Sequence, residues 1–193
     1  MPIQRARPKL TDLRGGTPLT ATSSIAASQL PAGSIIQTQK TVVTSTNTTT
    51  MTSNTVVEVT GLSVNITPQF SNSIIYLTGQ VVGEPSANGP HNMTFMFRRG
   101  STDLKGPVAS NRNVGIMFPS LSYYDVDQAS TPDSAVYFFH DTPSSTSELT
   151  YKIAVQTSVA GNPVWHLNKT VSDTDNSAYE RGVSFIMAQE IKV

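Results

Sequence analysis

Short stretches of strand-forming residues, separated by turn residues, recur along most of this chain and limit what it can fold into. Residues 148–159 (ELTYKIAVQTSV) show the pattern clearly, because apolar Leu149, Tyr151, Ile153 and Val155 alternate with mostly polar neighbours. Side chains on a β-strand point alternately to its two faces. An apolar residue at every second position therefore predicts a strand with one buried face.

Eight further segments carry strand signals of this kind, whereas no segment has the period of an amphipathic helix. Gly61 interrupts one of them and is expected to mark a bulge. Residues 83–90, 100–113 and 119–133 are expected to be long polar loops. The pattern predicts an all-β fold, an antiparallel β-sandwich that is jelly-roll-like or immunoglobulin-like rather than α/β. The eight segments are 34–44, 55–66, 73–82, 91–99, 114–118, 134–140, 164–170 and the end of 179–193.

Serine and threonine make up 48 of the 193 residues, and the 13 basic and 13 acidic residues cancel. Low hydrophobicity predicts disorder mainly when the net charge is high, so we interpret this composition as many strands joined by polar loops. The strand-rich part of the chain has no cluster of basic residues, which argues against nucleic-acid binding. There is no cysteine, hence no disulfide, and no apolar segment long enough to insert into a membrane.

The first 30 residues differ from the rest, since their apolar residues follow no period and prolines recur among them. We predict that residues 1–30 form an extended docking arm and that residues 31–193 form the β-sandwich body. The arm is expected to bind other proteins of a larger particle through basic and apolar side chains; the alternative is a solvated tail that contacts nothing. The residues expected to dock are Arg5, Arg7, Lys9, Leu10, Leu13 and Arg14.

Nothing in the sequence has the spacing of a catalytic site, so we expect a protein that is not an enzyme. His91, His140 and His166 lie apart without a metal-binding motif, and the segment 173–175 is half of a calcium loop at most. No cofactor and no metal are therefore expected. Residues 98–103 (RRGSTD) are interpreted as a strand end with a glycine turn rather than a phosphate site.

Three aromatic residues are candidates for contact with a ligand or a partner. Trp165 is expected to anchor the core or an interface rather than to serve as a platform for a sugar. Tyr123 and Tyr124 lie in a predicted polar loop, where loops held on a rigid scaffold often carry recognition. These two tyrosines are candidates for surface recognition, with folding back over the core as the equal alternative.

Several segments, taken in their order along residues 30–193, resemble small virion structural proteins and tail-fibre modules of tailed bacteriophages. The segments are LPAGSIIQ at 30–37, VTGLSVNITP at 59–68, FRRGST at 97–102, and DTD at 173–175 followed by YERG at 179–182 and EI at 190–191. The resemblance implies a structural protein of the virion, often a homotrimer. It transfers no binding residue to this sequence.

The function expected from this resemblance is a tail-fibre or tail-tip subunit that contacts the host surface. Its partners would be further copies of itself, other virion proteins bound through the arm, and a receptor on the host. The alternative within the virion is a capsid decoration (cement) protein. An alternative of another class is a carbohydrate-binding or carbohydrate-active module.

Overall fold

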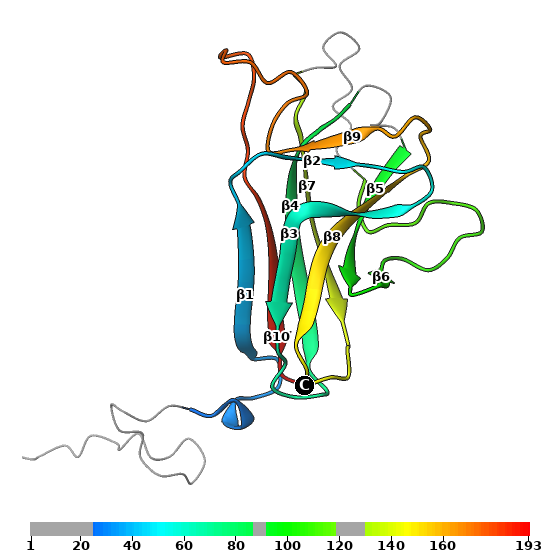
Figure 1. The fold of residues 1–193 in the computed structure, drawn as a ribbon. Helices are drawn as coiled ribbons and strands as arrows, with labels where there is room; N and C mark the ends of the chain where they lie inside the picture. Colours follow the sequence, from blue (N-terminus) through cyan, green and yellow to red (C-terminus); the bar gives the residue numbers. More distant parts are fainter. Residues whose placement is uncertain (1–24, 87–91, 119–129) are drawn as a thin grey trace, which may run out of the picture. The chain divides into compact units, whose positions relative to one another are not determined.

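The computed structural model describes residues 25–86, 92–118 and 130–193. The chain divides into two units, Met1–Pro31 and Ala32–Val193. The described part of the first unit, residues 25–31, contains the 3-10 turn η1 (Ala27–Gln29). All strands of the described residues belong to the second unit, where they form two antiparallel sheets (Figure 1).

The larger sheet, called sheet A, is organised around the long central strand β4. One edge of β4 pairs with β10 along its first half and with β9 at its end, and the other edge pairs with β7. β1 extends the sheet beyond β10, and β2 extends it beyond β9. The strands are β1 (Ile35–Val43), β2 (Asn47–Thr50), β4 (Ile74–Pro85), β7 (Asp133–Asp141), β9 (Val164–Leu167) and β10 (Ser184–Ile191).

The smaller sheet, called sheet B, has the order β3-β8-β5-β6. Its register shifts between Glu58 and Ser63, and Gly61 between them has a φ of 87°. The predicted interruption at Gly61 is thus confirmed, because glycine adopts this left-handed conformation without steric cost. The strands are β3 (Val56–Ile66), β5 (Met93–Arg99), β6 (Thr102–Leu104) and β8 (Leu149–Thr157).

The strand order is that of a jelly roll. Leaving aside the short strands β2 and β9, each sheet contains four strands, β1-β10-β4-β7 in one and β3-β8-β5-β6 in the other. Two sheets of four antiparallel strands, with the first strand beside the last, define this architecture. The sequence-based prediction of an all-β, jelly-roll-like sandwich is confirmed.

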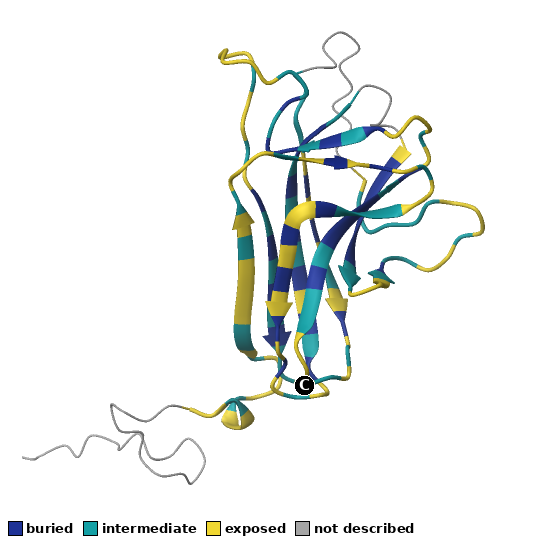
Figure 2. Ribbon diagram, in the orientation of Figure 1, coloured by how far each residue is buried: buried dark blue, intermediate teal, exposed yellow. Residues whose placement is uncertain are grey.

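The core lies between the two sheets and is built from the alternate positions that face inward. Figure 2 shows the resulting bands of buried and exposed residues along the strands. Gly79 on β4 leaves room for Phe97 and Ile153 of sheet B, since a Cβ at this position would lie 2.8 Å from Ile153 Cδ1. Among the largest fully buried side chains are Trp165, Tyr151, Phe95, Phe97, Met51, Leu62 and Ile66.

Three sequence-based predictions of local structure need correction. Residues 83–85, expected in a loop, continue β4 and pair with β9. Residues 102–104 within another expected loop form β6, which pairs with the end of β5. Residues 114–118, expected to be a strand, make only an isolated bridge between Met117 and Phe95. Each outcome depends on whether the fold offers a free edge at β9 or β5 for pairing, which a local apolar pattern does not reveal.

Candidate functional site

The outer face of sheet A carries apolar side chains that no part of the described chain covers. Phe138 and Val136 on β7 are 63% and 50% exposed, and Val42 on β1 is 51% exposed. Tyr76 on β4 stacks on Phe138 with ring centroids 6.2 Å apart. These side chains point outward because their neighbours at alternate positions, such as Ala135 and Tyr137, are buried in the core.

The register connects these positions across all four strands. Val42 pairs with Phe185 of β10, Phe185 pairs with Gln80 of β4, and Gln80 pairs with Val136 of β7. Met187 likewise pairs with Thr78, which is opposite Phe138. The outward-facing apolar residues of these four strands, with Gln80 and Thr78 between them on β4, form the surface called here the apolar face: Val42, Tyr76, Val136, Phe138, Phe185 and Met187.

Charge is scarce on this side of sheet A. Among the outward positions of the described strands β1, β10, β4 and β7, Lys40 on β1 carries the only formal charge at neutral pH. Monomeric proteins rarely expose a broad apolar surface, and those that do use it for binding. The arrangement is suited to association with another protein surface.

The predicted contact residues Arg5, Arg7, Lys9, Leu10, Leu13 and Arg14 lie outside the described residues, and so do Tyr123, Tyr124 and His91. The residues of the apolar face were missed by the sequence analysis. A signal for them exists, because Val136 and Phe138 alternate with the equally apolar Ala135, Tyr137 and Phe139. A strand that is apolar at consecutive positions has two faces to bury.

The two arginines of the segment 98–103 are both engaged by carboxylates. Arg98 Nε lies 2.7 Å from Asp103 Oδ1, and Arg99 Nε lies 3.0 Å from Asp141 Oδ2. The Tyr151 hydroxyl donates to the same Asp141 oxygen at 2.8 Å. Burial raises the pKa of Tyr151, and its hydrogen bond to Asp141 adds to this. The cluster stabilises one end of the sandwich, which agrees with a structural interpretation of these arginines.

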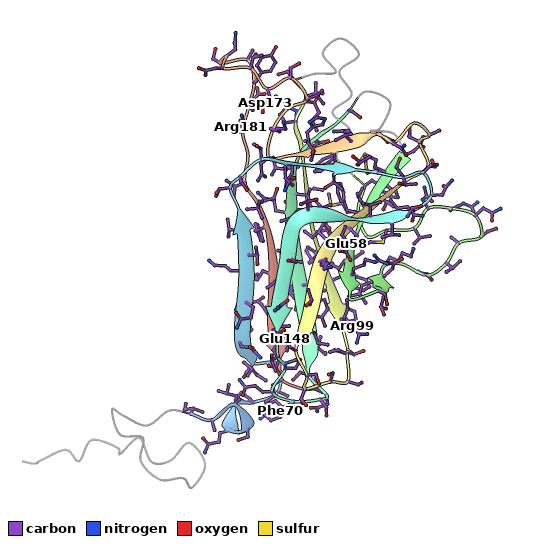
Figure 3. The ribbon with its side chains drawn as sticks, viewed as in Figure 1. Glu58, Phe70, Arg99, Glu148, Asp173 and Arg181 are labelled. Carbon is purple, nitrogen blue, oxygen red and sulfur yellow. The ribbon has the colours of Figure 1, made fainter. Side chains whose placement is uncertain are left out.

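The structure describes two of the three histidines, His140 and His166, together with Asp173. His140 and His166 lie on different strands, β7 and β9, and the described residues contain no cluster of three potential metal ligands. Asp173 forms ion pairs with Arg181 at 2.6 Å and Lys169 at 3.3 Å, and Figure 3 shows Asp173 and Arg181 in neighbouring segments. The carboxylate of Asp173 is thus paired with two cationic side chains of the protein.

Trp165 belongs to the core, which was one of the two anchoring roles predicted for it, the other being at an interface. Its side chain is fully buried and meets Phe95 edge to face, with ring centroids 5.2 Å apart. Gly83 lies directly beside it, since a Cβ at Gly83 would approach the indole to 3.1 Å. A buried indole cannot serve as a platform for a sugar, so Trp165 is not a ligand contact.

Two buried glutamates escaped the sequence analysis. Glu190 on β10 accepts hydrogen bonds from the backbone N–H groups of Gln69 and Phe70 and from the Ser73 hydroxyl, the last at 2.6 Å. Glu84 on β4 accepts from Thr131 and from the Val171 N–H. Each carboxylate satisfies otherwise unpaired donors of a turn or loop, which makes both residues structural anchors.

Comparison with known proteins adds no family to this description. A scan against protein-family models and a search of curated proteins both gave no match to the sequence. The part of the chain that the structure describes contains no helix with the length and apolar character needed to cross a membrane. The apolar face is therefore interpreted from its own geometry.

Proposed function

We propose that this protein is a non-enzymatic structural subunit of a tailed-bacteriophage virion, located at the tail fibre or tail tip, and that it assembles through the apolar face. The observation that carries the assembly role is the exposure of Phe138, Val136 and Val42 on one nearly uncharged sheet surface. Burying such a surface against another protein removes apolar area from water, which drives association.

The fold is compatible with this role but does not define it. Jelly rolls occur in viral capsid proteins and in lectins, and the same fold serves many unrelated functions. The assignment to a virion rests on the resemblance of residues 30–193 to phage structural proteins. The fold and the apolar face support a building block of an assembly within that class.

A second copy of the chain is the partner that fits the apolar face. The protein has no net charge, so copies do not repel one another strongly. Closed cyclic symmetry would bury the same side chains in every subunit. We propose a homotrimer, the state that the resemblance to phage proteins implies.

Light scattering of the purified full-length protein at micromolar concentration tests the assembly. A mass of three chains is expected, and a stable monomer would contradict the proposal. Labelling the subunit in intact virions and imaging them by electron microscopy tests the location. Label at the tail fibre or tip is expected, whereas label spread over the capsid would identify a decoration protein instead.

The arm carries the second part of the proposal, which is attachment to the particle. Residues 1–30 contain four basic residues and one acidic residue, so they are suited to an acidic surface on another virion protein. Deleting residues 1–30 is expected to leave a folded body that no longer joins the particle. Full incorporation of the shortened protein would contradict attachment through the arm, and failure to fold would contradict the domain boundary.

A further inference from the structure

A second candidate site is a pocket of about 300 Å³ beside the beginning of β5 and the end of β8. Its base includes Met93 and Thr94, which are almost fully buried. Pockets that bind small molecules begin at about this volume. The pocket therefore has room for a ligand the size of one or two sugar rings.

The walls of the pocket are attached firmly to these two strands. Asn54, in a turn with a φ of 57°, donates its backbone N–H to Thr157 O at 2.7 Å, and the Ser53 hydroxyl donates to Ser158 O at 3.0 Å. On the opposite side, Met117 O accepts from the Phe95 N–H at 2.8 Å. These hydrogen bonds hold both walls of the pocket against the two strands.

Gly115 permits the close approach of the second wall. A Cβ at this position would lie 1.8 Å from Thr94 Oγ1 and 2.7 Å from Phe95 O. The absence of a side chain lets residues 115–117 lie directly against β5. The preceding residues 111–113 are thereby placed along the pocket, although they belong to no strand.

The pocket is rich in amide side chains, contributed by Asn54, Asn92, Asn111 and Asn113. Within the described residues, the side-chain amides of Asn92, Asn111 and Asn113 make no hydrogen bond. Each amide offers two N–H donors and a carbonyl acceptor. Since a sugar hydroxyl both donates and accepts, an array of amides matches a polyhydroxylated ligand.

Arg112 is the only charged residue among those that line the pocket. Its guanidinium makes one long hydrogen bond, from Nη1 to Ala109 O at 3.4 Å, and no ion pair with the described residues. The remaining N–H groups can bind a carboxylate in bidentate geometry. Among the described lining residues the only formal charge is therefore positive, which favours an anionic group in the ligand.

Phe118 completes the lining with an apolar surface that is 67% exposed. An exposed aromatic ring beside hydrogen-bonding groups suits a ligand with one apolar and several polar faces. A pyranose ring has this character, because its C–H groups form an apolar face while its hydroxyl groups point outward.

We infer that this pocket binds a saccharide unit that carries a carboxylate, such as a uronic acid of a surface polysaccharide. Arg112 would pair with the carboxylate, the asparagines would bind the hydroxyl groups, and Phe118 would pack on the ring. The inference goes beyond assembly through the apolar face and does not depend on it.

The experiment compares D-glucuronic acid with D-glucose, which differ in having a carboxylate or a hydroxymethyl group at one carbon. Ligand-observed NMR and titration with the full-length protein are expected to show binding of glucuronic acid at least about tenfold tighter than of glucose. Arg112→Gln should abolish this preference and retain weak binding of both sugars. Asn113→Ala should weaken the binding of both.

Arg181→Gln is the matched control, because Arg181 is also exposed and does not line the pocket. This variant should bind like the parent protein. No binding of either sugar, equal binding of both, or a preference unaffected by Arg112→Gln would overturn the inference. Circular dichroism of each variant checks folding, and light scattering of the same samples tests assembly separately.

Discussion

The outer faces of the two sheets differ, although both follow the same alternation of inward and outward side chains. Sheet B presents a network of ion pairs, in which Glu58 lies 2.6 Å from Lys152 and 3.6 Å from Arg98. Sheet A presents Phe138, Val136 and their apolar neighbours. Charged side chains are well solvated by water, whereas exposing an apolar side chain to water costs free energy. This difference is why we propose the outer face of sheet A, rather than that of sheet B, as the surface for association.

The strongest test of this comparison places a charge on the apolar face. Phe138→Asp is expected to weaken self-association by about 3 kcal/mol, or about a hundredfold, because an ionised carboxylate would have to leave water in the interface. Light scattering over a dilution series measures the effect. Asn65→Asp adds the same charge to the outer face of sheet B, where Asn65 is exposed. This control variant should leave self-association unchanged. Equal effects of both variants would remove the distinction between the faces.

The next test contrasts the inner and outer sides of β4. Gly79→Ala should lower the free energy of unfolding by about 2 kcal/mol, since the new methyl group would meet Ile153 at 2.8 Å and Phe97 at 3.2 Å. Thr78→Ala, at the adjacent outward position, should cost only about 0.5 kcal/mol. Urea denaturation of both variants gives the two values. A smaller loss for Gly79→Ala than for Thr78→Ala would show that the inner packing is looser than described.

A smaller effect is expected from the charge network of sheet B. Glu58→Gln should cost about 0.5–1 kcal/mol of stability at low salt, because the side chains of the network are partly exposed and their attraction is screened. High salt should reduce the difference. Glu148→Gln makes the same substitution at an exposed carboxylate that forms no ion pair within the described residues. Thermal melting at low and high salt compares the two, and a salt-independent loss would argue against the network.

The smallest effect concerns a polar group inside sheet A. Burial lowers the pKa of His166 below its usual value of 6.5, and nearby Lys169 lowers it further. Protonation of His166 then favours the unfolded state. The contribution of this residue to the free energy of unfolding should be complete above about pH 6.5 and should decline as the pH falls below that value. Melting temperatures measured between about pH 7.5 and about pH 5 should show this decline. His166→Gln should make this decline of melting temperature with pH shallower. His140→Gln, a substitution of an exposed histidine, should leave the decline unchanged.

Sequence periodicity predicted the long strands well because each of them has one buried face. Residues 148–159 alternate clearly, and β8 occupies 149–157. The short strands β2 and β6 were missed, since their pairing depends on β9 and β5 rather than on a pattern of their own. The same limit explains the error at residues 114–118, where the apolar residues cover the edge of β5 without forming a ladder.

The candidate sites were predicted less well than the fold. The sequence pointed to basic residues of the arm and to Tyr123 and Tyr124, all outside the described residues. It did not reveal the apolar face, because an outward valine or phenylalanine is indistinguishable from a core residue until the sheet has a known inner side. It also gave no sign of the pocket, whose amides come from three separate segments around residues 54, 92 and 111–113.

By itself, the sequence determined the all-β class, the positions of the long strands and the bulge at Gly61, because these follow from the local alternation of side chains and from backbone sterics. Only the tertiary structure decided which strands pair, that Glu190 is buried beneath the turn at residues 69–73, and that Phe138 faces outward. The physical reason is that burial is a property of the packed sheets. Whether a charged or an apolar residue ends up buried is decided only when segments distant in the sequence pack together.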